Sequence, residues 1–191
     1  MSRLIETIRI ADGKIENIEY HFKRMRLSKP SFDWDLNEIL TISLPSQGIH
    51  KLRVVYDSKI KTLSISPYKI RPVRSLKLVF DDNIVYDHKF EDRTYLDRLS
   101  AMKDDCDDVL IVKNGLVTDV SYANIIFRRD NRWYTPDSFL LNGTMRQRLL
   151  DMGRITEQQI SVDDLRQYSH FKLINAMLRD DALESQVLNI R

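Results

Sequence analysis

Two dipeptides that favour tight hairpin turns, Asp12-Gly13 and Asn114-Gly115, constrain the fold of this chain more than any other feature of its sequence. Asn, Asp and Gly adopt the left-handed backbone of a two-residue hairpin loop at little cost, and β-prone residues lie on both sides of each dipeptide. A further strand pair is expected around Asp57-Ser58. Antiparallel hairpins are therefore expected in both halves of the chain.

Short helical patterns separate these hairpins, which together predict an α+β fold. Strands are expected at Leu4–Ile10, Lys14–Ile18, Lys51–Tyr56, Lys61–Ser66, Leu76–Phe80, Asp108–Val112, Leu116–Phe127, Trp133–Pro136 and His170–Ala176. Helices are expected at Tyr20–Leu27, Asp35–Ile42, Thr94–Lys103, Met145–Met152 and Val162–Gln167. The segment Ile70–Arg74, which contains Pro72, is expected to connect a small N-terminal lobe of residues 1–72 to a larger lobe of residues 73–191.

The composition excludes several classes of protein. Basic and acidic side chains nearly balance, 30 against 28, so no strongly basic face for nucleic acid is expected. A single cysteine, Cys106, excludes an internal disulfide framework, and the four aspartates around it disfavour a nucleophilic thiolate. No stretch has the form of a signal peptide or the length of a membrane span, so we expect a cytoplasmic protein.

The common signatures of enzyme chemistry are also missing. The sequence contains no GxGxxG, GxxxxGK[ST], HExxH, CxxC or GxSxG motif. Its four histidines are scattered and have no cysteine partners, so no metal site is expected. Three less specific features remain as candidates for function.

The first feature is Lys89, which lies at a strand-to-helix junction close to Tyr86, His88 and Phe90. Partial desolvation among aromatic rings lowers the pKa of a lysine. Its amine is then more often neutral and can act as a nucleophile or a base. The commoner interpretation is a solvated surface lysine beside His88 and Glu91, because most lysines remain exposed.

The second feature is Asn142-Gly143-Thr144, which precedes a predicted helix. Backbone N–H groups at a helix N-terminus and a threonine hydroxyl together bind phosphate well, and Arg24 could supply a cation. The alternatives are an ordinary Gly-Thr helix cap and, for Arg24, a solvated helix face.

The third feature is the polar middle of the segment Val117–Asn124, where Asp119, two hydroxyls and Asn124 interrupt a strand pattern. Such groups need hydrogen-bond partners if they are buried. The alternative is an edge strand that turns these side chains toward solvent, and the residues alone do not separate the two interpretations.

Taken together in chain order, these pieces resemble the fold-type IV pyridoxal phosphate enzymes, which include branched-chain and D-amino acid aminotransferases and 4-amino-4-deoxychorismate lyase. The matching stretches are Ile5-Glu-Thr-Ile-Arg9, His21-Phe-Lys-Arg24, His88-Lys-Phe-Glu-Asp-Arg93, Asp108–Val112 with its Asn-Gly turn, Val117–Asn124, Trp133-Tyr-Thr-Pro136, Asn142-Gly-Thr-Met-Arg146 and Leu173-Ile-Asn-Ala-Met177. They run in family order across nearly the whole chain. No single stretch is specific, whereas their joint order and spacing are, and the spacing from Lys89 to Arg93 is most similar to the lyase branch.

The resemblance implies a two-lobed fold, with a small N-terminal α/β lobe and a larger barrel-like lobe, and it implies roles for individual residues. Lys89 matches the lysine that bonds to pyridoxal 5'-phosphate and then moves protons. Asp119 matches the acid that keeps the pyridine nitrogen of the cofactor protonated, and Asn124 supports it from the same strand. The remaining matches to cofactor-binding positions are Arg24 for the phosphate, Gly143, Thr144 and Met145 for the helix N-terminus that cradles it, and Asn175 for a further phosphate contact.

On the substrate side, Thr7 and Arg9 alternate along the first predicted strand and so share a face. The resemblance implies that this face is directed toward the substrate, where Arg9 could pair with a carboxylate. Arg71 and Tyr68, near the connection between the lobes, are weaker candidates. Lobe packing and surface charge explain them equally well.

The reaction that the resemblance implies is the cleavage of 4-amino-4-deoxychorismate to 4-aminobenzoate, a folate precursor, and pyruvate. An aminotransferase acting on branched-chain or D-amino acids would use the same residues. A third possibility is a catalytically inactive ligand-binding homologue, because Asp119 replaces the usual glutamate and the chain starts almost directly at Leu4, where family members usually have an extra strand and loop. The resemblance also implies a homodimer that takes a small-molecule amino substrate.

Overall fold

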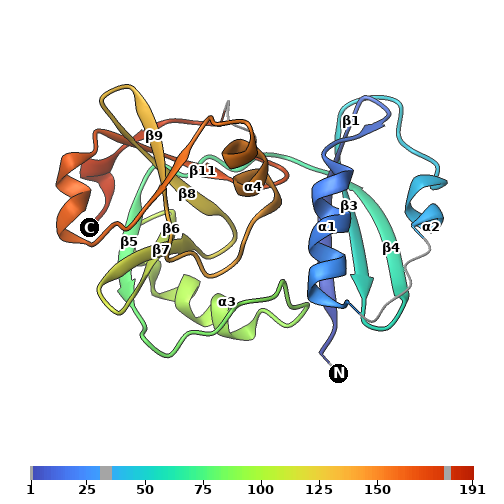
Figure 1. The fold of residues 1–191 in the computed structure, drawn as a ribbon, viewed down its shortest axis with the longest axis horizontal. Helices are drawn as coiled ribbons and strands as arrows, with labels where there is room; N and C mark the ends of the chain where they lie inside the picture. The colour runs from blue at the N-terminus through green and yellow to red at the C-terminus, as the bar shows by residue number, and fades with distance from the viewer. Residues whose placement is uncertain (1, 31–35, 179–181) are drawn as a thin grey trace. The chain divides into compact units, whose positions relative to one another are not determined.

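A computed structural model describes residues 2–30, 36–178 and 182–191 of the chain. Contacts within it define two compact units: a first unit of residues 1–70 with 88–92, and a second unit of residues 71–87 with 93–191. The fold is α+β, as predicted, with short helices between hairpin-linked strands (Figure 1). The predicted division at residue 72 differs from these units chiefly in the segment His88–Asp92, which groups with the first unit.

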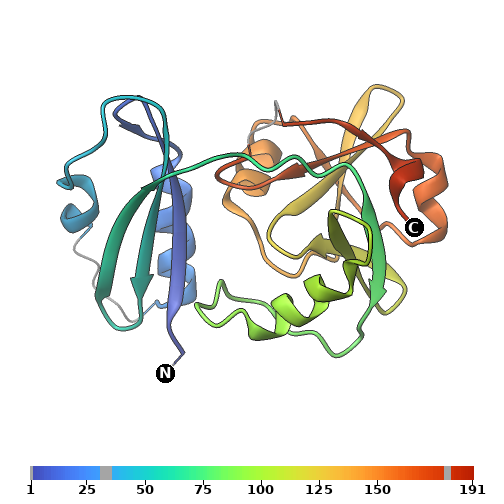
Figure 2. The same ribbon diagram turned by 180° about the vertical axis from the view of Figure 1, so that it is seen from behind.

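The first unit is an antiparallel sheet with a helix on one face. Asp12 and Gly13 have φ angles of 46° and 77°, the left-handed backbone expected of their hairpin. Helix α1 (Ile18–Ser28) covers one face of the sheet, and the view from behind shows the strands in front of it (Figure 2). The strands, in the order in which they pair, are β2 (Lys14–Ile15), β1 (Leu4–Ala11), β3 (Ile49–Tyr56) and β4 (Ile60–Pro67), and a short helix α2 (Asn37–Leu40) follows α1.

The core of the first unit forms where α1 meets β1 and β3. Ile8 and Ile10 of β1 pack with Met25 of α1 and with Leu52 and Val54 of β3, and all five side chains are fully buried. Alternate residues of a strand face the same side, so one face of β1 carries this apolar row. The predicted helix at Asp35–Ile42 is shorter in the structure, and Asp35 lies outside the described residues.

The segment His88–Asp92 is held against the start of β1. The Ile5 N–H donates to the Lys89 carbonyl (2.9 Å) and the Glu91 N–H donates to the Arg3 carbonyl (2.9 Å). Leu4 and Phe90 form an antiparallel bridge between these two bonds. The segment therefore extends the first sheet by a strand-like edge, although it follows the first residues of the second unit in sequence.

The second unit contains two sheets. The Asn114-Gly115 turn again has positive φ angles, 52° and 76°, and joins two strands of the smaller sheet. That sheet has the order β5 (Leu76–Phe80), β6 (Asp108–Lys113) and β7 (Leu116–Val120). The larger sheet has the order β10 (Thr156–Gln158), β9 (Arg132–Pro136), β8 (Asn124–Arg129), β11 (His170–Ile174) and β12 (Ser185–Gln186).

Short helices fill the connections of the second unit. Its α-helices are α3 (Thr94–Ser100) and α4 (Thr144–Asp151), and its 3-10 segments are Ala101–Lys103, Asp163–Gln167 and Val187–Asn189. The predicted helix at Val162–Gln167 is therefore a 3-10 turn. Within the described residues, no helix is both long and apolar enough to cross a membrane.

The predicted long strand Leu116–Phe127 is two strands in different sheets. β7 ends at Val120 and β8 begins at Asn124, and the Val120 N–H donates to the Ala123 carbonyl (3.1 Å) across a tight bend. Buried side chains from both sheets, including Leu110, Val120 and Phe127, share one core. The bend is what brings the polar side chains of this segment to one place.

Candidate functional site

The first group of predicted site residues surrounds Lys89 in the first unit. Lys89 is half-buried, and the two backbone bonds described above fix the main chain on either side of it. Glu91 adds ion pairs with Arg3 (3.0 Å) and Arg53 (3.1 Å), while Phe90 packs against the core of the unit. This main chain is more constrained than that of an ordinary surface lysine, which suits a residue whose amine must be placed accurately.

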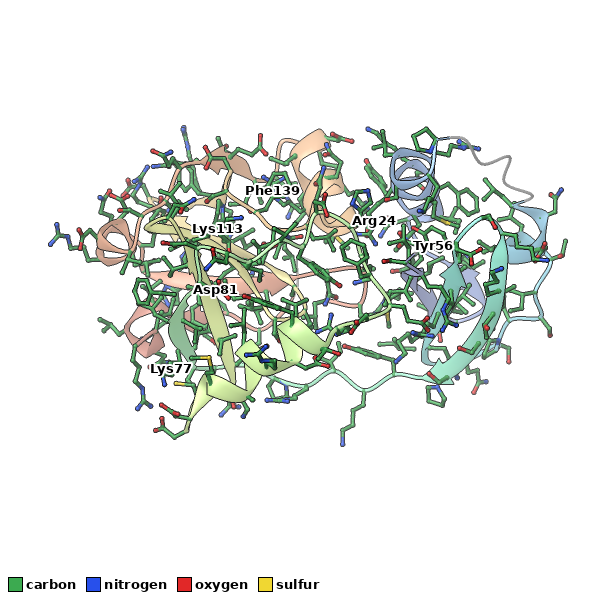
Figure 3. All side chains as sticks on the ribbon, turned by 90° about the horizontal axis from the view of Figure 1, so that it is seen from below. Arg24, Tyr56, Lys77, Asp81, Lys113 and Phe139 are labelled. Carbon is green, nitrogen blue, oxygen red and sulfur yellow. The ribbon has the colours of Figure 1, made fainter. Side chains whose placement is uncertain are left out.

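A buried polar cluster lies on the neighbouring part of the first unit, where β1 faces α1. The carboxylate of Glu6, fully buried, accepts hydrogen bonds from Arg24 Nε (2.8 Å) and Arg24 Nη2 (2.5 Å) and lies 2.7 Å from His21 Nδ1. Arg24, labelled in Figure 3, is thus gripped along one edge of its guanidinium group. His21 is completely buried as well.

The charges of this cluster are settled by its burial and its hydrogen bonds. Burial would raise the pKa of Glu6, but Arg24 and His21 outweigh that effect and lower it to about 2. Burial lowers the pKa of His21, and its bond to Glu6 offsets only part of that effect. At neutral pH the cluster therefore holds a glutamate anion, an arginine cation and a neutral imidazole. A neutral imidazole bonded to a carboxylate through Nδ1 carries its proton on Nδ1.

The predicted substrate residues fall into both units. In the first unit, Arg9 is 8% exposed and pairs with Glu16 (3.1 Å), and its charge partly offsets the burial that raises the pKa of Tyr68. Thr7, two residues earlier on β1, is half-buried. Arg71 belongs to the second unit, is exposed, and donates from Nη2 to the Asp107 carbonyl (2.6 Å).

The second group of site residues lies at the bend between β7 and β8. The carboxylate of Asp119 accepts hydrogen bonds on Oδ2 from the backbone N–H groups of Leu140 and Leu141 (3.0 Å each) and on Oδ1 from Asn124 Nδ2 (2.8 Å). Asn124 Nδ2 also donates to the Leu141 carbonyl (2.9 Å). Asp119 and Asn124 are each 5% exposed. The interpretation of this segment as a solvent-facing edge strand is therefore wrong.

Asp119 is less firmly ionised than Glu6. Burial raises its pKa to about 6, and the hydrogen bonds from Leu141, Asn124 and Leu140, with the charge of Arg146, recover only part of the cost. Its three donors leave one of the roughly four acceptor positions of a carboxylate for a further donor. A buried carboxylate of this kind gains by a cationic N–H partner, which would return its pKa toward the ordinary range.

Gly143 lies beside Asn124, at the start of helix α4. A Cβ added at Gly143 would overlap Asn124 Oδ1, so only glycine fits beside the Asn124 amide. Gly143 is the N-cap of α4, and no side chain caps the helix, so Thr144 is the first helical residue and not a hydroxyl cap. Thr144 and Met145 are buried, at 5% and 1% exposure. The N–H groups of the first helical turn, which lack partners within the helix, therefore begin next to the Asp119–Asn124 pair.

Asn175 holds a turn after β11. Its Oδ1 accepts hydrogen bonds from the Met177 and Leu178 N–H groups (2.8 Å each), and its Nδ2 donates to the Tyr122 carbonyl (3.3 Å). Tyr122 belongs to the bend between β7 and β8. Asn175 therefore lies beside the same bend as Asp119 and Asn124, and its contact with phosphate stays a prediction.

Three contributors to these groups were not found from the sequence. Glu6 and His21 are 15 positions apart, and only the packing of α1 on β1 brings them together. Arg146, 1% exposed, bonds to the Pro136 carbonyl (3.1 Å) and to Glu157 (2.5 Å), and lies over the Phe139 ring at 4.1 Å. The spacing of His21 and Arg24 by one helical turn was the only local signal for the first cluster.

Comparisons with known proteins agree with the resemblance. A Haemophilus somnus 129pt protein of solved structure, named "putative 4-amino-4-deoxychorismate lyase", has 38% sequence identity and a TM-score of 0.86, and the match covers 93% of this chain and 97% of that one. An uncharacterized protein of Haemophilus influenzae is 35% identical over 185 residues, 93% of this chain and 98% of the relative. A Schizosaccharomyces pombe protein named "Putative aminodeoxychorismate lyase" is 27% identical, with 92% of this chain and 86% of the relative covered.

More distant structures share the fold. A hypothetical aminotransferase from Mycobacterium tuberculosis, solved in a PLP-bound form, has 18% identity and a TM-score of 0.77 over 99% of this chain and 81% of that one. The sequence profile of the family described as Amino-transferase class IV matches residues 54–179, well over half of this chain. The predicted fold-type IV architecture is confirmed by these matches. The chain therefore belongs to the class IV aminotransferase family, whose members depend on pyridoxal phosphate.

Proposed function

We propose that this chain is a pyridoxal phosphate enzyme that cleaves 4-amino-4-deoxychorismate to 4-aminobenzoate and pyruvate. The observation that carries the cofactor is the arrangement of Asp119, Asn124 and Gly143, where a buried carboxylate is clamped beside a helix start that tolerates no side chain. The choice of a lyase is supported by the 38% identity to the Haemophilus somnus protein, whose name includes that activity.

The residues present fit the cofactor chemically. Asp119 keeps room for one more donor, as the protonated pyridine nitrogen requires, and a cationic N–H partner would offset the burial that raises its pKa to about 6. Gly143 and the first turn of α4 offer backbone N–H groups of the kind that bind phosphate. Asp119 keeps the charge of the usual glutamate, with a reach one methylene shorter. The assignment of Arg24 and Lys89 to the same cofactor rests on the family resemblance.

When bound, pyridoxal phosphate supplies an electron sink for a carbanion beside the substrate nitrogen. The roles of the protein are then defined by its side chains. Lys89 would hold the cofactor, and its Nζ, when free, would remove the proton from the carbon that carries the substrate amine. Asp119 would keep the pyridine nitrogen protonated, and Arg24 and the start of α4 would bind the phosphate. Arg9 is proposed to pair with a substrate carboxylate. With that proton removed, cleavage of the ring C–O bond would release the enol of pyruvate, which takes up a proton to become pyruvate, and would leave the aromatic 4-aminobenzoate.

The first experiment measures the cofactor itself. Protein purified with pyridoxal phosphate, dialysed and treated with borohydride is expected to show a visible absorption band before reduction and a reduced adduct on Lys89 by peptide mass mapping. Lys89→Ala is the test variant, and Lys59→Ala, an exposed lysine of the first unit, is the matched control. No band in the wild type, or an adduct that persists on another lysine in Lys89→Ala, would remove the proposed cofactor site.

A second experiment separates the lyase from an aminotransferase. An aminotransferase given an amino acid alone converts its bound cofactor to the pyridoxamine form, whereas a lyase has no need of that step. We expect 4-aminobenzoate and pyruvate in equal amounts from 4-amino-4-deoxychorismate, and no pyridoxamine form with branched-chain or D-amino acids. The opposite pattern would favour the aminotransferase.

The inactive homologue predicts no reduced adduct on Lys89 in the first experiment, and neither the lyase products nor the pyridoxamine form in the second. We further propose, from the resemblance alone, that the chain is a homodimer, which sedimentation equilibrium tests directly.

A further inference from the structure

The roles assigned so far do not explain why Glu6 and His21 are buried beside Arg24. Burying a glutamate and an arginine together is costly, and replacing such a pair by apolar residues is often neutral for stability. Fold stability alone therefore gives no clear reason for a fully buried carboxylate at Glu6. The geometry of its bonds suggests a different reason.

Glu6 forms hydrogen bonds with only one edge of the Arg24 guanidinium group. Its two oxygens accept from Nε and Nη2, which form one edge of the planar guanidinium group. A paired, side-on contact of this type fixes the plane and the direction of the group, because both bonds must stay aligned. The Nη1 corner is consequently turned away from Glu6. Arg24 is 13% exposed in its side chain, whereas Glu6 is not exposed at all.

His21 completes the support from the other side of Glu6. Its Nδ1 lies 2.7 Å from Oε2, the same oxygen that accepts from Arg24 Nη2. His21 lies one helical turn before Arg24 on α1, so both side chains extend from the same helix face toward the same strand residue. Glu6 thus has a second partner besides Arg24, and a movement of Glu6 with Arg24 would break the contact with His21.

We propose that Glu6 is the positioning residue for Arg24: it fixes the guanidinium plane so that Arg24 binds the phosphate of the cofactor, with His21 holding Glu6 in place. This inference rests on the proposed function, since it requires Arg24 to bind phosphate. The charges of Glu6 and Arg24 cancel, and His21 is neutral. The cluster therefore holds Arg24 in place without a buried net charge.

The test compares two ligands that differ only in the phosphate. Wild type, Glu6→Gln and Glu6→Asp are titrated with pyridoxal 5'-phosphate and with pyridoxal, and binding is followed by the visible absorption band. We expect Glu6→Gln to weaken binding of pyridoxal 5'-phosphate about ten-fold or more, with pyridoxal binding changed less than about two-fold. Glu6→Asp keeps the charge but shortens the reach, so a smaller selective loss is expected. Glu19→Gln, an exposed glutamate in the first turn of α1, is the matched control.

The outcomes are distinct. Equal weakening of both ligands would show that Glu6 supports only the fold of the first unit, and no weakening would show that Arg24 needs no positioning; either result overturns the inference. A wild type that binds neither ligand overturns the proposed function as well, and only that result does so. If circular dichroism shows that Glu6→Gln fails to fold, Glu6→Asp carries the same comparison, and equal weakening by it overturns the inference.

Discussion

Asn124 decides what can occupy the start of helix α4. Its amide donates to Asp119 and to the Leu141 carbonyl, and its oxygen fills the space where a side chain at Gly143 would lie. Because both bonds come from one Nδ2, the side chain cannot rotate away without losing them together. One buried amide therefore sets the direction of a carboxylate and the identity of a neighbouring residue.

Gly143→Ala tests this arrangement. The added Cβ displaces Asn124 and breaks its buried hydrogen bond to Asp119 and its partly buried bond to the Leu141 carbonyl, so we expect the free energy of unfolding to fall by about 2 to 4 kcal/mol. Gly153→Ala is the matched control: its φ is +65° and its Cβ meets nothing within 4 Å, so it costs only the backbone strain, about 1 kcal/mol. Urea unfolding measures both, and equal losses would contradict the role of Asn124.

The pKa of Glu6 leads to a prediction about acid stability. Its pKa is lowered from 4.5 to about 2 on folding, so the folded state gains stability when the carboxylate is ionised. That gain is fully present above pH 4.5 and is lost as the pH falls toward 2, with an upper limit of about 3 kcal/mol. The difference in unfolding free energy between wild type and Glu6→Gln should therefore shrink between pH 5 and pH 3. A difference that stays constant over this range would be inconsistent with the buried ion pair.

Asp119 has the opposite sign. Its pKa is raised from 3.8 to about 6, so its contribution to stability is complete below pH 3.8 and is lost as the pH rises through 6. As the pH falls in mildly acidic solution, Glu6 therefore lowers the free energy of unfolding while Asp119 raises it. Comparing variants with the wild type at each pH separates the two contributions.

At the scale of elements, the segment His88–Asp92 behaves as an added edge of the first sheet. Glu91 anchors it through Arg3 and Arg53 on the surface, where ion pairs contribute little. We expect Glu91→Gln to lower the free energy of unfolding by no more than about 1 kcal/mol, but to speed hydrogen exchange at the Ile5 N–H, which donates to the Lys89 carbonyl. Glu38→Gln, on exposed α2, is the control. Unchanged exchange at Ile5 would mean that the backbone bonds hold the segment unaided.

The elements could be predicted where the signal is local. The Asp12-Gly13 and Asn114-Gly115 turns fix their hairpins by backbone preference alone, and β5 was predicted with its observed bounds. The strands β10 and β12 are only three and two residues long and form because partners lie beside them, so no local pattern marks them. The bend between β7 and β8 was expected only as an irregularity.

The site residues divide in the same way. Asp119 and Asn124 stood out because polar side chains crowd a strand. The Glu6–His21 contact could not be found, because nothing in either neighbourhood specifies the other. The hydrogen bonds from the Leu140 and Leu141 N–H groups to Asp119 could not be predicted either, because every residue except proline has a backbone N–H group.

At the scale of the whole molecule, the proposed cofactor should act as a stabiliser. A ligand that binds only the folded chain raises its stability by about 2.7 kcal/mol at a free concentration one hundred times its Kd. Thermal unfolding in increasing pyridoxal phosphate should therefore move the transition to higher temperature in the wild type and much less in Lys89→Ala. An unfolding temperature of the wild type that does not change with the cofactor concentration would contradict the proposal.

Residues 88–92 belong to the first unit, although residues 71–87 of the second unit precede them in the chain. This order affects how the first unit forms during synthesis. A ribosome makes the chain from its N-terminus, so four strands and α1 of the first unit emerge early, yet the last edge of their sheet is absent until residues 71–87 of the second unit have been made. The first unit cannot be complete when its own continuous stretch ends at residue 70. A nascent chain stalled there should present the open side of β1, and a chaperone or a second nascent chain would meet that edge before Lys89 closes it.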